Sequence, residues 1–132
     1  MENYPAFEKI DDVLHIEIIQ ALRDTIEIKD PYTRGHSDRV SELSVLMGEK
    51  LRLPEEDLIS LRIGGLFHDI GKIGMTDEIL SKTEKLTNEE FLDIQKHPVI
   101  GSYILSKSPM FKDITPIIKH HHERYDGTRI SR

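Results

Sequence analysis

The chain has 132 residues, no cysteine and seven histidines, and its 24 acidic and 18 basic side chains give a formal net charge of −6. That length fits one domain, because domains usually run to about 100–200 residues. Without cysteine, the chain has no disulfide, no thiolate metal site and no cysteine nucleophile, as is common in a reducing compartment. The acidic balance provides no general attraction to polyanions, so duplex nucleic acid is not an expected partner.

The apolar residues are distributed as in a protein that folds in water. They make up 37% of the chain, which is enough for a buried core, but no apolar run approaches the roughly 18 residues that a membrane helix needs. The first twelve residues, MENYPAFEKIDD, are too acidic and polar for a secretory signal. We therefore expect a cytoplasmic protein without a membrane partner.

Helical periodicity dominates the first half of the chain. Apolar residues recur at steps of three and four from Ile10 to about Ile28, and Asp30-Pro31 ends this helix because a residue before proline disfavours helical geometry. A second helix is expected over roughly Gly35 to Leu51. A third begins with Pro54 in its first turn and reaches His68-Asp69, where the following glycines mark a break.

The second half continues in the same way. Thr87 and Glu90 form a capping-box pattern, which predicts a helix from there to about Lys96. Pro98 starts another helix that ends near Leu105, and a last one is expected near Ile114 to His122. No alternating strand pattern competes with these helices, so the sequence predicts an all-α fold.

Six of the histidines gather where these helices begin or end: His36, His68, His97, His120, His121 and His122. Neutral imidazole is the commonest metal ligand in proteins, and a neighbouring aspartate can bridge two cations. Successive helical residues point about 100° apart, so at most two of the three consecutive histidines can serve one site. The remaining histidine, His15, lies in an amphipathic helix and is expected to have no role in a site.

The segment from Gly64 to Gly74 has two interpretations. It places His68, Asp69 and Lys72 at one helix-to-loop transition, where glycines allow a ligand to approach closely and the lysine can face phosphate oxygens. The alternative is an ordinary helix end, with Gly71 as its C-cap and a solvated lysine. The combination of small residues, a candidate ligand pair and a lysine in one segment favours a metal site.

Five short motifs, in their order along the chain, give this sequence a specific resemblance. They are Gly35-His36-Ser37, LFHDIGKIG from Leu66 to Gly74, Leu86-Thr87 with Glu89-Glu90, His97-Pro98-Val99-Ile100-Gly101 and HHERYDG from His121 to Gly127. From about Ile19 to Thr128 the chain resembles the HD-GYP branch of the HD-domain metal-dependent phosphohydrolases. The resemblance implies an HD-domain helical bundle that hydrolyses the bacterial second messenger cyclic di-GMP.

The resemblance also implies roles for single residues. His36, His68 and Asp69 would hold one metal ion, and Asp69 would bridge to a second ion held by His97, His121 and His122. Asp69 and Lys72 would be the catalytic residues. Lys72 would lie against the scissile phosphate, and Arg124 is a further candidate for binding the substrate.

The implied cofactors are two divalent transition-metal ions. Some members of the branch hold a third ion with a glutamate four residues before the first histidine, but Tyr32 stands at that position here. Histidine-rich sites favour borderline transition metals over magnesium. The resemblance implies iron or manganese, with zinc and nickel as alternatives.

The end of the sequence departs from the pattern of the branch. After Thr128 the branch continues with Gly-Tyr-Pro and further helices that carry a late aspartate ligand, whereas this chain reads Arg129-Ile130-Ser131-Arg132. The resemblance therefore implies a lead-in over residues 1–18 and a C-terminally truncated domain over residues 19–132, lacking the last helices. Uncovered apolar surface would favour a homodimer. Sensory or receiver domains are expected in the parent protein.

Three functions are compatible with this interpretation. The leading hypothesis is a phosphodiesterase that acts on cyclic di-GMP or a related cyclic dinucleotide. A second is a catalytically inactive signalling module that binds a nucleotide or a partner protein. A third is an HD phosphohydrolase that acts on nucleotides or phosphomonoesters.

Overall fold

The computed structural model describes the backbone of residues 5–128 and the side chains of residues 17–128. Its elements, in chain order, are α1 (Pro5–Lys29), η1 (Pro31–Thr33), α2 (His36–Lys50), α3 (Glu55–Phe67), η2 (Ile70–Gly74), α4 (Asp77–Leu80), α5 (Asn88–Ile94), α6 (His97–Leu105), η3 (Pro109–Phe111) and α7 (Thr115–His120), where η marks a 3-10 helix. These described elements include no strand, which confirms the predicted all-α fold. None of the helices searched is long and apolar enough to cross a membrane.

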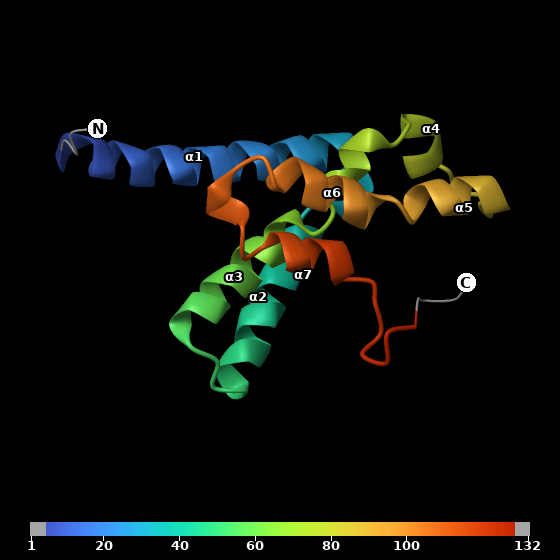
Figure 1. The fold of residues 1–132 in the computed structure, drawn as a ribbon. Coiled ribbons are helices and arrows are strands. Elements are labelled where there is room, and N and C mark those ends of the chain that lie inside the picture. Colours follow the sequence, from blue (N-terminus) through green and yellow to red (C-terminus); the bar gives the residue numbers. More distant parts are fainter. Residues whose placement is uncertain (1–4, 129–132) are drawn as a thin grey trace.

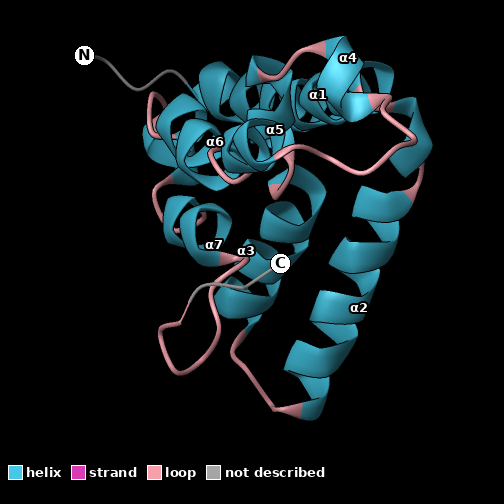
Figure 2. Ribbon diagram, turned by 90° about the vertical axis from the view of Figure 1, so that its right-hand side faces the viewer, coloured by secondary structure: helices cyan, strands magenta, loops and turns pink. Residues whose placement is uncertain are grey.

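Two arms of helices meet at the centre of the molecule. The long helix α1 forms one arm together with α6, while α2 and α3 form a hairpin that projects away from it (Figure 1). The short helix η2 packs against both α1 and α6, and α7 packs against α3 and α6. The view turned by 90° shows α2 standing on the outer side of this hairpin (Figure 2).

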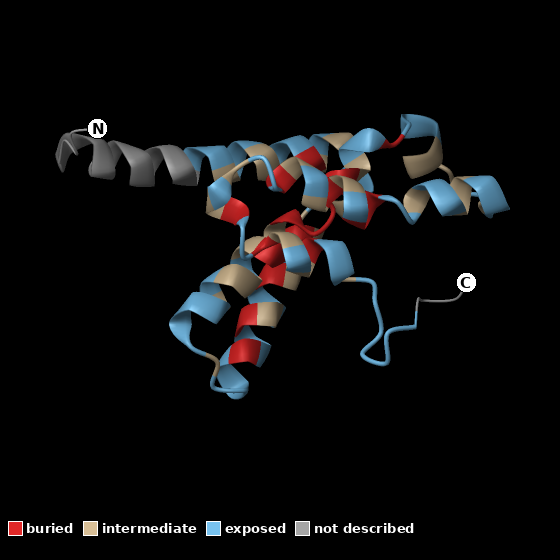
Figure 3. Ribbon diagram, viewed as in Figure 1, coloured by how far each residue is buried: buried red, intermediate tan, exposed pale blue. Residues whose placement is uncertain are grey.

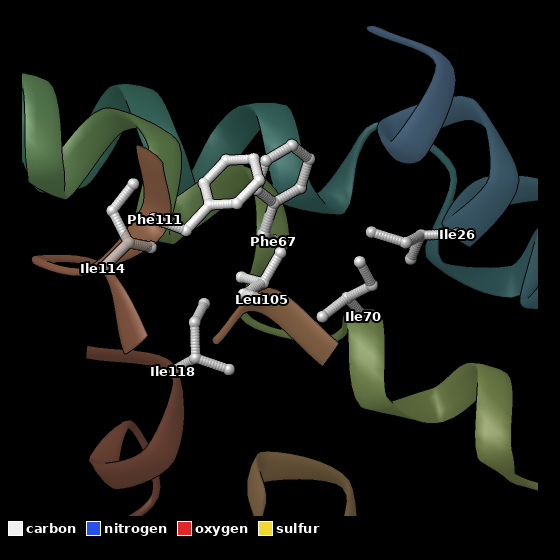
Figure 4. Packing of buried hydrophobic residues seen from close by; sticks show 7 residues of the cluster. All are labelled: Ile26, Phe67, Ile70, Leu105, Phe111, Ile114 and Ile118. Atoms are coloured by element: carbon white, nitrogen blue, oxygen red, sulfur yellow. The ribbon is translucent and has the colours of Figure 1, made fainter. Parts of the chain in front are cut away.

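The core lies where these elements meet. Buried residues concentrate at the junction between the two arms (Figure 3). Phe67 and Phe111 pack edge to face there, with ring centroids 5.7 Å apart. The main apolar cluster takes one residue each from α1, α3, η2, α6, η3, the turn before α7 and α7. In that order they are Ile26, Phe67, Ile70, Leu105, Phe111, Ile114 and Ile118 (Figure 4). Because Phe67 and Ile70 flank His68-Asp69, the core fixes the backbone on both sides of that pair.

Most predicted helix boundaries agree with the structure to within two residues. The capping box is confirmed, since the Thr87 hydroxyl accepts a hydrogen bond from the Glu90 amide and the Glu90 carboxylate accepts one from the Thr87 amide. The placement of Pro54 was wrong: its backbone is extended and it caps α3 rather than lying in the first turn. The sequence did not predict the 3-10 helices or α4, because such short segments show no periodicity.

Two glycines shape the backbone near the candidate site. Gly35 has a φ of 69°, in the left-handed region that favours glycine, and this bend starts α2 at His36. Gly71 lies so close to α6 that a Cβ atom there would overlap the carbonyl oxygen of His97. Gly71 is therefore required for close packing between η2 and α6, and the alternative of a simple C-cap was wrong.

Candidate metal centre

Asp69 lies at the centre of the histidines that the sequence singled out. It follows the end of α3, and only 6% of its surface is exposed. Its two carboxylate oxygens face different sides, and each has its own histidine neighbours. We call the set His36, His68 and Asp69 the first group, and the set Asp69, His97, His121 and His122 the second group.

The first group joins the start of α2 to the end of α3. The Nε2 atoms of His36 and His68 are 3.2 Å apart. Asp69 Oδ2 lies 3.2 Å from His68 Nε2 and 4.0 Å from His36 Nε2. The tight packing of α2 against α3 places these side chains together although the two histidines are 32 residues apart.

The second group joins the start of α6 to the end of α7. The Nε2 atoms of His97 and His121 are also 3.2 Å apart, and they lie 3.3 and 3.9 Å from Asp69 Oδ1. The ring of His122 is 5.0 Å from that of His97 and 4.1 Å from that of His121, measured between centroids. The second group therefore offers three imidazoles and one carboxylate oxygen.

Three of these histidines are oriented by the same type of backbone contact. His68, His97 and His121 each place Nδ1 2.6–2.7 Å from the carbonyl oxygen three residues earlier in the chain. A carbonyl oxygen only accepts hydrogen bonds, so Nδ1 carries the proton in each ring. In the neutral ring Nε2 then carries a free lone pair. A hydrogen bond at one ring nitrogen is the usual way in which proteins orient the other nitrogen toward a metal ion.

This arrangement gives a direct test of whether the residues fit a cation. The Nε2 atom of His97 lies 3.2 Å from that of His121 and 3.3 Å from Asp69 Oδ1, although in the neutral rings all three atoms are acceptors. Such a cluster is stabilised only by a proton or a cation between its members. The donor atoms of each group lie within 4.8 Å of one another, while a cation bound at about 2.1 Å spans donors up to about 4.2 Å apart. Both groups therefore fit a divalent cation after side-chain shifts of less than about 1 Å.

The charges around the centre act differently on its members. Burial opposes the charge on Asp69, but its contacts with the rings of His68 and His97 and the charge of Lys72 hold its pKa far below the ordinary value. Burial lowers the pKa of His121 to about 4 and also lowers the pKa values of His36 and His122. Burial acts in the same direction on His68, but its hydrogen bond to Asp69 and the charge of that carboxylate outweigh burial and raise its pKa.

Lys72 completes the first group from the side of η2. Its Nζ atom lies 3.2 Å from Asp69 Oδ2 and 3.0 Å from Asp30 Oδ2. Burial opposes the charge of the ammonium, but these two carboxylates raise its pKa, so Lys72 is a cation at physiological pH. The interpretation of Lys72 as a solvated lysine was wrong, since only 17% of its side chain is exposed.

Asp30 is the residue of this centre that the sequence analysis missed. It was interpreted only as part of the stop before Pro31, yet it is 4% exposed and its carboxylate binds Lys72 from 42 residues away. The sequence did contain a signal for this role. Asp30 stands six residues before the candidate ligand His36, between the end of a helix and the turn at Gly35.

The remaining candidates lie outside both groups. His120 points away and pairs with Glu123 at 2.8 Å, in agreement with the expectation that one of the three consecutive histidines would not face the site. Arg124 lies on an exposed turn, where its guanidinium faces Asp126 at 3.8 Å. Tyr32 is 76% exposed, and the side chain of His15 lies outside the described residues.

A family model for the HD domain matches residues 20–130. The chain belongs to the HD domain family. The match covers every residue of both groups, including the adjacent His68 and Asp69 at their centre.

This HD domain is also similar to longer bacterial proteins. It is 38% identical over 90% of its length to 3'3'-cGAMP-specific phosphodiesterase 3 of Vibrio cholerae, and 37% identical over 92% to a cyclic di-GMP phosphodiesterase of Thermotoga maritima. A cyclic di-GMP phosphodiesterase response regulator of Xanthomonas campestris is 37% identical over 85% of the chain. The matched regions cover 26%, 33% and 30% of these three proteins, so the chain spans a quarter to a third of their length.

Proposed function

We propose that this HD domain is a metal-dependent phosphodiesterase that hydrolyses cyclic di-GMP or a related cyclic dinucleotide. The observation that carries the proposal is the buried Asp69 carboxylate, with one oxygen facing each of two histidine groups. The names of the relatives support the choice of substrate, since they are phosphodiesterases of cyclic di-GMP or 3'3'-cGAMP.

The two groups supply the ligands for two cations. His36, His68 and Asp69 would hold the first, and Asp69, His97, His121 and His122 would hold the second. A set of five imidazoles and one carboxylate favours transition metals such as iron or manganese, or zinc or nickel, over magnesium. Bound cations in such a site supply Lewis-acid stabilisation of the charge that develops on the phosphate, and they lower the pKa of water.

The residues of the chain contribute orientation and charge. The carbonyls that bind Nδ1 of His68, His97 and His121 orient the rings before any ligand arrives, so only small side-chain shifts are needed. Lys72 is a cation beside Asp69 and can move onto a phosphate oxygen. Asp30 positions Lys72 from the opposite side. Arg124 would contact the substrate only if the exposed turn folds toward the centre.

The proposal is tested with purified protein loaded with manganese or iron and incubated with cyclic di-GMP or 3'3'-cGAMP. Chromatography should detect linear dinucleotide or GMP, and Asp69→Ala should abolish the product. Saturable binding of the dinucleotide without turnover would instead indicate an inactive signalling module. Hydrolysis of nucleotide monoesters, with the cyclic dinucleotides intact, would indicate a phosphohydrolase of another specificity.

Three further predictions belong to the parent protein rather than to the site. They are action in the cytoplasm, formation of a homodimer and regulation by sensory or receiver domains. Size measurement in solution tests the homodimer directly, and the gene sequence tests the presence of the other domains.

A further inference from the structure

A hollow of about 320 Å³ lies beside the second group, between α5, the start of α6 and the end of α7. Figure 1 shows that α5 leads directly into α6 and that α7 lies alongside α6. The hollow is lined mainly by Phe91, Ile94, Gln95, His97, Pro98 and His122. Its volume is at the small end of the range of about 300–1,000 Å³ that is typical of ligand sites.

Two residues belong both to the hollow and to the second group. His97 and His122 form one wall of the hollow, and their rings are among the candidate ligands that face Asp69. A molecule that fills the hollow is therefore adjacent to any phosphate bound at the second group. In a nucleotide only a ribose separates the phosphate from the base, so one nucleotide can occupy both places.

The other walls have the chemistry that a nucleobase requires. Phe91, Ile94 and Pro98 offer an aromatic ring and apolar surface against which a flat heterocycle can stack. The amide of Gln95 has both donors and an acceptor for the edge of a base, and Lys119 and Glu123, of opposite charge, complete the lining. Apolar walls with a few polar groups are typical of small-molecule sites.

We propose that this hollow is the subsite for a purine base of the nucleotide whose phosphate is bound at the second group. The inference rests on the proposed function for the presence of a nucleotide, and it adds the place where the base is held. Phe91 provides the stacking surface and Gln95 contacts the edge of the base. Both residues then contribute to affinity for the substrate, and neither contributes to binding of the metal.

The experiment compares two compounds that carry the same sugar phosphate, GMP and ribose 5-phosphate, by isothermal titration to the manganese-loaded protein. Because stacking on an aromatic side chain contributes a factor of roughly 5 to 150 in affinity, GMP should bind at least about five times more tightly. Phe91→Ala and Gln95→Ala should each reduce this ratio and leave the affinity for ribose 5-phosphate unchanged. Leu92→Ala is the matched control, because Leu92 lies in α5 outside the hollow and is 57% exposed.

A second measurement does not depend on the variants. In the wild-type protein loaded with diamagnetic zinc and bound to GMP, nuclear Overhauser effects should connect the purine H8 proton with the Phe91 ring and the Ile94 methyl groups. Circular dichroism shows whether Phe91→Ala folds; if it does not, Gln95→Ala, whose side chain is exposed, provides the test.

Three outcomes would overturn the inference. They are equal affinity for GMP and ribose 5-phosphate in the wild type, an unchanged ratio in both variants, and binding of neither compound. Failure of the proposed function looks different: the cyclic dinucleotides would stay intact while the preference for GMP, and its dependence on Phe91 and Gln95, would remain.

Discussion

The two groups around Asp69 differ in what already neutralises its carboxylate. In the first group, Oδ2 is shared by His68 and the ammonium of Lys72, at 3.2 Å each. In the second group, Oδ1 faces the imidazoles of His97 and His121, whose Nε2 atoms lie 3.3 and 3.9 Å away. A cation entering the first group must compete with Lys72 for Oδ2, whereas at the second group the carboxylate oxygen faces imidazole lone pairs.

The comparison indicates which half of the centre is better prepared for a metal ion. Burial lowers the pKa of His121 to about 4, so this ligand is unprotonated at neutral pH, while the pKa of His68 is raised by Asp69. We therefore expect the second group to bind the first equivalent of metal and the first group to bind more weakly. The following predictions test this order.

The largest effect is expected from Asp69→Ala, which removes the one ligand common to both groups. Loss of the shared charge should reduce binding at both positions by about 100-fold or more, because even residues that only orient ligands contribute about 10- to 100-fold. Elemental analysis after dialysis should find no stoichiometric metal. Asp93→Ala, an exposed aspartate paired with Lys96, is the control and should retain the metal of the wild type.

The next largest effect should separate the groups. His97→Ala should weaken binding of the first equivalent by about 100-fold, whereas His36→Ala should leave that equivalent in place and weaken only the second. Titration with manganese, followed by electron paramagnetic resonance of the free ion, measures both steps. Equal losses of the tighter step in the two variants would contradict the proposed order.

Lys72→Met should change metal binding and turnover in opposite directions. Without the ammonium at Asp69 Oδ2, the first group should bind its ion more tightly, by roughly ten-fold. Turnover of the cyclic dinucleotide should fall by about 100-fold, as when one charged or hydrogen-bonding partner of a developing anion is removed. Tighter metal binding with full activity would mean that Lys72 only balances the charge of Asp69 and Asp30.

Gly71→Ala should disturb the packing that holds the two groups together. The added methyl group would overlap the backbone of His97, so η2 and α6 must move apart, and we expect a loss of about 3 kcal/mol in the free energy of unfolding. Gly74→Ala is the matched control in the same 3-10 helix, because its Cβ would meet only the flexible Ile100 side chain at 3.3 Å. Chemical denaturation of both variants measures the difference.

The smallest effect concerns pH. A raised pKa means that His68 keeps its proton to higher pH, and a cation must displace that proton, so affinity at the first group should fall as the pH decreases from about 8 to about 6. The lowered pKa of His121 means that protonation of this ligand does not weaken the second group in that range. Manganese titrations at several pH values should separate the two steps; a parallel decrease in both would contradict the comparison.

The sequence predicted the parts of this molecule that depend on local patterns. Periodic apolar residues located the long helices, and Thr87 with Glu90 located the start of α5. The clustering of histidines at helix ends also pointed to a site at one place in the bundle. The division into two groups came from the family resemblance, because spacing along the chain does not determine which imidazoles face the same oxygen.

What the sequence did not predict depends on contacts between distant segments. Asp30 and Lys72 are 42 residues apart, and only the packing of η2 against α1 brings them together. The need for glycine at position 71 arises from the approach of α6, which begins 26 residues later in the chain and shows no local signal. The 3-10 helices are too short for periodicity to identify them.

The central claim, that Asp69 and its histidines form a centre for two cations, is tested most directly by counting bound metal. The purified protein should be stripped with a chelator, reloaded with manganese and analysed for metal per chain after dialysis, beside Asp69→Ala. We expect stoichiometric metal in the wild type, filling the second group before the first, and none in the variant. Absence of stoichiometric manganese, iron, zinc or nickel from the folded wild-type protein would contradict the account.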